Sequence, residues 1–275
     1  MDAVAVRIGK DAESTQSVEA VVRPYAYATR LLGLAFGAGT QLLFLATAAQ
    51  LFLFLRGPAA PSAEYHPWRD ALLALFFAWP HSLLLFPPMQ KLIKRRIHPA
   101  FLGCIHCTVT CISLLILFQC WSTSSTALWQ FSGTAAWFMS LGFYASWVAL
   151  LYSLWLTGLG YQTGLTQWFY WLRDKKPPRR EFVTRGAYRI MRHPVYLSFL
   201  GLIWFTPTMT WDHVILTAVW TVYIYVGSWL KDRRLQHFIG PAYREYAERV
   251  PGFPLIGFGI IGRAKRKCGA PVPTA

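Results

Sequence analysis

The stretch that decides the fold runs from Ile97 to Leu172 and contains no Asp, Glu, Lys or Arg. Its two apolar halves read PAFLGCIHCTVTCISLLILFQCW (99–121) and GTAAWFMSLGFYASWVALLYSLWL (133–156). The polar segment Ser122–Thr126 separates them. A membrane-spanning helix needs about 20 mainly apolar residues. The uncharged run is too long for one helix, so it predicts two spans.

Further apolar segments lie on both sides of this run. Residues 31–55, 71–90, 194–206 and 213–230 each predict a span, which brings the total to about six. The last two are short and predict a tight helical hairpin that turns near Pro207 and Asp212. Residues 158–171 are rich in Gly, Gln and aromatics and predict an interfacial or re-entrant segment. The fold class is therefore all-α integral membrane.

Composition supports a membrane protein over a soluble one. The 275 residues are 55% hydrophobic and 14% charged, and the formal net charge is +15. Soluble domains carry about 25% charged residues. A soluble nucleic-acid-binding protein can be equally basic, but it does not contain long uncharged stretches of this kind.

The basic residues predict the orientation of the chain. Cytoplasmic loops collect Lys and Arg. With six spans, the N-terminus, the 91–96 loop, the 173–193 loop and the C-terminal part hold 4, 4, 8 and 9 of them, 25 of the total 27. We therefore expect both termini in the cytoplasm, in a bacterial inner membrane. The charge indicates membrane lipid as a partner and no nucleic acid.

The same reasoning divides the chain into four parts. A polar N-terminal segment, 1–28, precedes helices one to four and the interfacial segment, 29–172. The basic loop, helices five and six and a cytoplasmic C-terminal helix occupy 173–251, and a basic tail occupies 252–275.

Most of the polar side chains in the C-terminal half lie between 173 and 251. Pro194 suits the first turn of a helix, which places Arg192 and His193 at the cytoplasmic mouth of the fifth span. Tyr243 and Tyr246 are three residues apart and share one helix face. These groups predict a half-buried pocket, or alternatively an interfacial belt that anchors helix ends.

The motif Arg192-His193-Pro194-Val195-Tyr196 resembles the Arg-His-Pro-x-Tyr motif of the isoprenylcysteine carboxyl methyltransferase superfamily. The resemblance is to the branch that contains bacterial methanethiol S-methyltransferase and the nuclear-envelope protein nurim. It extends over nearly the whole membrane region, and the other stretches that carry it are His81-Ser82, Gly164-Leu165-x-Gln167, Thr184-x-Gly186-x-Tyr188-Arg189, Thr206 to Thr210 and Gly240-x-x-Tyr243-x-x-Tyr246.

The resemblance implies a membrane methyltransferase that uses S-adenosylmethionine and requires no metal. The acceptor would be a small or lipid-soluble thiol. By position in the motif, Arg192 and His193 would be the catalytic pair. The residues implied in cofactor binding are Tyr188, His193, Pro194, Tyr196, Asp232, Tyr243 and Tyr246. His81 and Gln167 would line the acceptor pocket.

Two residues depart from the family pattern. The family has a Glu-Glu pair after the last span, where this chain has Lys231-Asp232. Ser198 replaces the glycine that follows the motif. A fixed cation at 231 would repel a bound sulfonium. The alternative is a non-catalytic structural or partner-binding subunit that keeps the methyltransferase-like fold. Such a subunit would have a protein partner in a membrane complex.

Other reactive side chains have simpler explanations. Cys104, Cys107 and Cys111 share one face of the third span, where thiols can bind metal but also pack well between membrane helices; we expect packing. His81 lies beside Pro80, either as a functional group or bonded to a carbonyl that the proline frees. Asp70 and Asp212 are expected at the outer surface.

Overall fold

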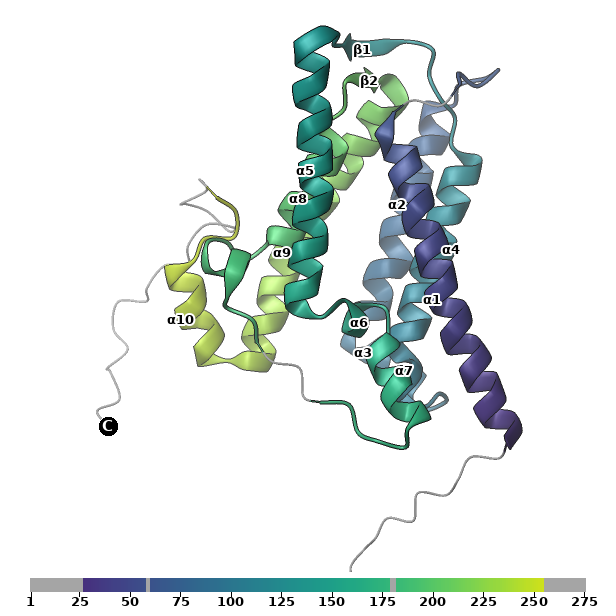
Figure 1. Cartoon of the computed structure of the whole chain (residues 1–275), viewed down its shortest axis with the longest axis vertical. Coiled ribbons are helices and arrows are strands. Elements are labelled where there is room, and N and C mark those ends of the chain that lie inside the picture. The colour runs from purple at the N-terminus through teal and green to yellow at the C-terminus, as the bar shows by residue number, and fades with distance from the viewer. Residues whose placement is uncertain (1–26, 58–59, 179–181, 255–275) are drawn as a thin grey trace, which may run out of the picture.

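The computed structural model describes residues 27–57, 60–178 and 182–254, and nearly all of its regular structure is helical (Figure 1). The predicted polar N-terminal segment and the basic tail lie almost entirely outside these described residues. The α-helices are α1 (Tyr27–Arg56), α2 (Pro67–Leu85), α3 (Pro87–Lys94), α4 (Leu102–Cys120), α5 (Gly133–Thr157), α6 (Leu159–Gln162), α7 (Leu165–Leu172), α8 (Pro194–Trp204), α9 (Trp211–Ile239) and α10 (Pro241–Arg249). Two short 3-10 helices, η1 (Pro99–Phe101) and η2 (Gly186–Arg189), and two strands, β1 (Ala127–Gln130) and β2 (Thr208–Thr210), complete the described part.

Among the described residues, four helices are long and apolar enough to cross a membrane: Ala28–Arg56, Pro99–Cys120, Gly133–Thr157 and Trp211–Ile239. The pair α2 and α3 forms a fifth candidate, bent by 67° at Phe86. The all-α membrane class is therefore confirmed, whereas a count of six spans is not. The predicted fifth span, α8, has only 11 residues, about 16 Å of helix against a hydrocarbon core of about 30 Å.

The predicted short hairpin is only half correct. The second helix of the predicted hairpin, 213–230, is longer than predicted. Helix α9 has 29 residues and runs from Trp211 to Ile239. It continues through Lys231 and Arg234 because long basic side chains can extend from a helix end toward water while their stems cover apolar surface. As a result, the last turns of α9 carry Asp232 beside the start of α8.

A small ribbon closes one end of the bundle. Strands β1 and β2 pair antiparallel, with Trp129 opposite Met209 and Gln130 opposite Thr208. Figure 1 shows them beside the upper end of α5, where that helix begins, whereas α10 lies lower in the view, toward the other end of the molecule. We call these the ribbon end and the α10 end. The sequence motif Thr206 to Thr210, predicted as a hairpin turn, supplies β2.

Asp70 and Asp212 are not surface charges, contrary to the prediction. Both carboxylates are buried at the ribbon end, with Asp70 0% exposed. Asp70 accepts hydrogen bonds from the backbone N–H and the hydroxyl of Ser122, at 3.1 and 2.7 Å. Asp212 accepts from the Ser124 N–H at 2.9 Å and from Trp121 Nε1 at 3.1 Å. The polar segment between the spans folds over these carboxylates and satisfies them, as burial of a charge requires.

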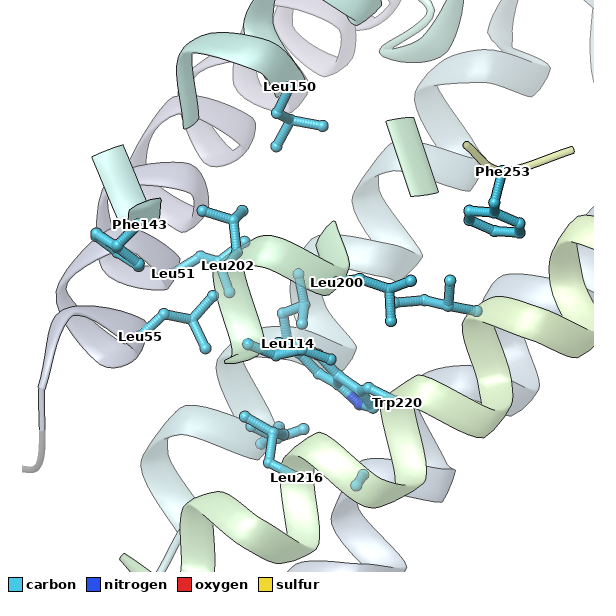
Figure 2. Packing of buried hydrophobic residues seen from close by; sticks show 14 residues of the cluster. Leu51, Leu55, Leu114, Phe143, Leu150, Leu200, Leu202, Leu216, Trp220 and Phe253 are labelled. Atoms are coloured by element: carbon cyan, nitrogen blue, oxygen red, sulfur yellow. The ribbon is translucent and has the colours of Figure 1, made fainter. Parts of the chain in front are cut away.

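The main apolar core joins the two sides of the bundle (Figure 2). Leu202 and Leu216 are fully buried within it, and Trp220 packs against Phe77 of α2 with ring centroids 5.2 Å apart. Helix α5 packs along α8, and α2 lies between α4 and α9. Phe253, from the segment after α10, reaches the same core and fixes that segment against α9 (Figure 2).

The predicted interfacial segment forms α6 and α7, and α7 packs against α1. Gly37 makes this possible, because a Cβ at that position would lie 2.0 Å from Trp168 Nε1. The same indole nitrogen donates to the carbonyl of Gly33 at 2.9 Å. Cys104 is fully buried in this cluster beside Trp168 and Trp171. It therefore serves packing between helices.

Candidate functional site

The motif residues meet at the α10 end, where four segments come together. The 3-10 helix η2 leads into Arg192 and His193, and α8 then begins at Pro194. Gly240, with φ 73°, lets the chain turn sharply from α9 into α10. The segment after α10 returns to the motif, because the Arg192 N–H donates to the Pro251 carbonyl at 2.9 Å. The site is thus assembled from residues more than 50 positions apart in the chain.

Asp232 is the central acid of the site. Its Oδ2 accepts from Arg192 Nε at 3.2 Å and from Nη2 at 2.8 Å. Its Oδ1 accepts from the Tyr243 hydroxyl and lies 3.1 Å from His193 Nε2. The carboxylate therefore fills the space between His193 and Tyr243, two of the residues that the family resemblance implies in cofactor binding.

Arg192 is held almost entirely by the protein. Besides Asp232, its Nη1 donates to the carbonyls of Ala247 and Val250, at 3.0 and 2.8 Å. These two carbonyls end α10, so the guanidinium ties that helix to the start of α8 and the end of α9. A buried charge needs such pairing. In this arrangement Arg192 orients the site rather than facing an open space.

The three motif tyrosines lie on the α10 side of the cluster. Tyr246 donates its hydroxyl to the Tyr188 carbonyl at 2.6 Å, and its ring lies 5.9 Å from that of Tyr243. Phe182 packs against both rings. Burial, with the nearby carboxylate of Asp232, raises the pKa of Tyr243 above its usual value. Burial also raises the pKa of Tyr246, so both phenols stay protonated at neutral pH.

His193 is fully buried between aromatic rings. The rings of Tyr196 and Phe253 each lie 5.5 Å from the imidazole. Burial lowers the pKa of His193, against the opposing effect of Asp232, so the ring is neutral at pH 7. Its Nδ1 has no hydrogen-bond partner among the described residues. A buried nitrogen without a hydrogen-bond partner is rare, so His193 Nδ1 is the atom of the site at which a bound ligand would supply the missing bond.

Lys231, the departure from the family pattern, lies above an aromatic face. Its Nζ is 5.3 Å from the centroid of the Tyr196 ring, within the range of a cation–π contact. The Tyr196 hydroxyl donates to the Gly227 carbonyl at 3.5 Å. Lys231 and Asp232 follow each other on α9 but point to different parts of the site. Lys231 therefore does not replace the acid that binds Arg192.

An apolar groove of about 770 Å³ begins beside Pro194 and runs along α8 toward the ribbon end. Small residues of α5 form its opposite wall, among them Gly142 and Ala149. Ser198, the other departure, lines the groove and donates its hydroxyl to the Pro194 carbonyl at 2.9 Å. The groove thus presents mainly apolar atoms along α8 and reaches the first residue of that helix.

The two residues predicted for the acceptor pocket are on different helices, and no described contact joins them. Gln167, on α7, donates from Nε2 to the Tyr161 carbonyl at 3.4 Å. His81, on α2, has its Nδ1 3.2 Å from Thr110 Oγ1 and so is not bonded to a carbonyl freed by Pro80. Its ring lies 6.4 Å from that of Tyr223 on α9. Of the two, only His81 has a described contact with α9, the helix that also carries Asp232.

Several residues of the site have no signal in the sequence. Phe253 closes over His193 from a segment with no recognisable motif, and Phe182 does the same over the tyrosines. The Ala247 and Val250 carbonyls that bind Arg192 are backbone groups, so no residue type marks them. Arg233 and Arg234 carry the same charge, so the sequence does not indicate that Arg233 is exposed and Arg234 is partly buried.

Comparison with known proteins gives relatives over most of the chain. A methanethiol S-methyltransferase of Pseudomonas sp. (strain GM41(2012)) is 27% identical over 238 residues, 83% of this chain and 92% of that protein. Methanethiol S-methyltransferase 2 of Bradyrhizobium diazoefficiens is 31% identical over 182 residues, 66% of this chain and 70% of that protein. Nurim of Danio rerio is 27% identical over 165 residues, 56% and 57% of the two chains.

No family model matches the chain, and no solved structure matches it. The name of these relatives implies a methyl donor. Three observations point to the same family. They are the Arg-His-Pro-x-Tyr motif, the integral-membrane architecture and these relatives. The chain belongs to the methanethiol S-methyltransferase family.

Proposed function

We propose that this protein is a membrane-embedded methyltransferase that moves a methyl group from S-adenosylmethionine to a small thiol. The observation that carries the proposal is the buried cluster around Asp232, built by the motif residues in a chain whose relatives are methanethiol S-methyltransferases. A thiol substrate of this size is apolar enough to approach through the lipid, and the groove beside Pro194 suits it.

The residues present fit such a methyl donor. His193 Nδ1 is buried without a partner and can bond to a polar group of the nucleoside. The rings of Tyr196 and Phe253 beside it can contact a base or a sulfonium. His193, Pro194 and Tyr196 would hold the cofactor directly. The bound cofactor supplies an activated methyl group on a sulfonium.

The rest of the cluster would position these groups. Arg192 and Asp232 fix the ends of α8, α9 and α10 relative to one another, and the hydroxyls of Tyr243 and Tyr246 secure the same frame. Methyl transfer to sulfur is an in-line displacement, for which alignment of donor and acceptor and exclusion of water are the protein's main tasks. Arg192 is thus a positioning residue in this proposal.

The proposal includes the setting of the enzyme. The chain lies in a bacterial inner membrane with both termini in the cytoplasm, so that the α10 end faces a water-soluble cofactor. Its partners are membrane lipid and the methyl acceptor. A protein partner in a membrane complex is compatible with this setting, and no nucleic-acid partner is proposed. The basic loops 91–96 and 173–193 support this orientation.

Calorimetry of the purified full chain in detergent tests cofactor binding. We expect heat from S-adenosylmethionine binding, and a weaker affinity for the His193→Ala variant. His98→Ala is the matched control, because His98 is exposed and lies outside the site. Lys231→Glu is expected to keep binding. Absence of heat at millimolar cofactor for the unaltered protein would contradict the proposal.

A second candidate function is a non-catalytic membrane subunit, as the nurim resemblance allows. The observation that favours it is Lys231, whose ammonium group occupies the Tyr196 face that a sulfonium could use. Such a subunit would bind no cofactor in the same calorimetry and would copurify with a fixed partner. Restored binding in Lys231→Glu alone would identify Lys231 as the cause of lost activity.

A further inference from the structure

The groove between α5 and α8 is far larger than a small thiol requires. Its volume is about 770 Å³. Sites that bind drug-sized ligands have volumes of about 300–1,000 Å³. Methanethiol consists of one sulfur and one carbon with their hydrogens. At about 30 Å³ for a group the size of water, it would fill less than about a tenth of the groove. Most of the groove is therefore left for another occupant.

The serine hydroxyls in the groove walls already have hydrogen-bond partners. Ser146 and Ser153 of α5 each donate to the carbonyl four residues earlier, at 2.7 Å. Ser198 of α8 donates in the same way to the Pro194 carbonyl at 2.9 Å. A hydroxyl carries a single hydrogen, so these three have no proton left for an occupant. The walls therefore favour a hydrocarbon chain, which needs no hydrogen bond.

The length of the groove matches one leaflet of a bilayer. Along α8 the groove extends from Pro194 to Trp204 and Phe205. That is a distance of about 16 Å, at about 1.5 Å per residue. Along α5 it covers a similar distance, from Gly142 to Ser153. The hydrocarbon core of a bilayer is about 30 Å thick, so each leaflet contributes about 15 Å. An extended acyl chain therefore suits the groove from end to end.

Aromatic side chains mark the end of the groove that lies at the lipid headgroups. Tyr152 lines the groove, and its ring stacks on that of Trp155 with centroids 6.3 Å apart. Trp155 is 72% exposed. Tyr and Trp gather at the membrane–water interface, at the level of the headgroups. At the other end, Trp204 Nε1 donates to the Thr221 hydroxyl at 3.0 Å and so needs no water. The headgroup end of the groove is therefore the end beside η2.

Two arginines lie at this headgroup end. Arg185 precedes η2 and Arg189 ends it, while Ala187 between them lines the groove. The segment packs on the groove wall, because a Cβ on Gly186 would lie 2.6 Å from the Tyr152 hydroxyl. Both arginines are exposed, and no ion pair joins either of them to another described residue. Guanidinium groups bind phosphate with two parallel hydrogen bonds, so this end of the groove complements a phosphate.

We propose that the groove binds one acyl chain of an anionic phospholipid whose phosphate lies at Arg185 and Arg189. The lipid belongs to the leaflet at the α10 end, because that leaflet places its headgroups beside η2. A zwitterionic phospholipid has the same chains but carries a compensating cation in its headgroup, so the two arginines favour the anionic class. Binding of this lipid does not require methyl transfer. It gives the general contact with membrane lipid one defined position in the fold.

Native mass spectrometry of the full chain tests the acyl-chain site. The protein is taken from nanodiscs of equimolar phosphatidylglycerol and phosphatidylcholine, and the lipids that stay bound after release are counted. We expect one phosphatidylglycerol to remain on the wild type. Ala149→Phe places a ring in the groove at an exposed position and should lower this retention about ten-fold or more. Ala135→Phe is the matched control, because Ala135 is an exposed residue of α5 outside the groove.

A second pair of variants tests the headgroup. Arg185→Gln combined with Arg189→Gln should abolish the preference for phosphatidylglycerol over phosphatidylcholine while one lipid remains bound. Lys91→Gln combined with Lys94→Gln is the control, because these exposed bases lie on α3. Equal retention of the two lipids by the wild type, or equal retention by Ala149→Phe and Ala135→Phe, would overturn the proposal. A dimer in place of the lipid-bound monomer would assign the groove to a second copy of the chain and overturn it as well.

Discussion

Arg192 and Asp232 are the pair on which the α10 end is built. Two guanidinium nitrogens converge on one carboxylate oxygen, while the other oxygen binds Tyr243. The pair links the start of α8 to the end of α9, and the same guanidinium binds the last carbonyls of α10.

Removal of the acid should therefore cost much stability. Asp232→Ala removes the carboxylate that pairs with the buried guanidinium of Arg192, and loss of one partner of a buried pair typically costs about 3–5 kcal/mol. Asp174→Ala is the matched control, because Asp174 also pairs with an arginine, Arg30, but both are exposed. That change should cost about 1 kcal/mol or less. Thermal unfolding in detergent measures both, and equal losses would contradict the structure.

The contact of α7 with α1 depends on Gly37. Gly37→Ala would place a methyl group on the Trp168 indole, and such overpacking costs about 1–3 kcal/mol. Gly39, two residues along the same helix, has open space beside it, so Gly39→Ala should be neutral or slightly stabilising. Unfolding midpoints and the tryptophan emission of the variants check this. A Gly39 effect as large as that of Gly37 would refute it.

The hydroxyl of Tyr246 secures η2 to α10. Tyr246→Phe removes its hydrogen bond to the Tyr188 carbonyl, a loss of about 0.5–1.5 kcal/mol. Hydrogen exchange should then rise at η2 and α10 and stay unchanged in α1. Uniform exchange across both regions would show that the bond holds nothing in place.

Burial of neutral His193 predicts a pH dependence of stability. Its pKa is lowered below the ordinary value of about 6.5, so the unfolded chain binds more protons as pH falls below that value. The stabilising contribution is complete above about pH 6.5 and is lost on acidification through the lowered pKa. Unfolding of the wild type should therefore become easier from about pH 6.5 downward, and His193→Asn should show a weaker slope in that range. Identical slopes would contradict it.

Much of this arrangement could be predicted from the sequence. Uncharged runs such as the one before Ser122 identify spans. Transfer of a charged side chain into lipid costs free energy at each position of a helix, so charges are excluded along its whole length. The motif places His193 near Asp232, which also bonds to the distant Tyr243, but the role of these residues in binding stays a prediction. Local pattern could not reveal that Asp212 is buried or that Thr110 fixes His81, since those partners come from other helices.

The ribbon end and the α10 end differ in how they are joined. Near β1 and β2, the bonds of Asp70 to Ser122 and of Asp212 to Ser124 tie the segment between α4 and β1 to the starts of α2 and α9. At the α10 end, the bonds of Arg192 link α8, α9 and α10 to one another but do not include α2 or α4. Among the described residues, separation of these two groups of helices is therefore opposed by buried bonds at the ribbon end alone. If the proposed nucleoside enters between them, we expect the widening at the end that carries His193.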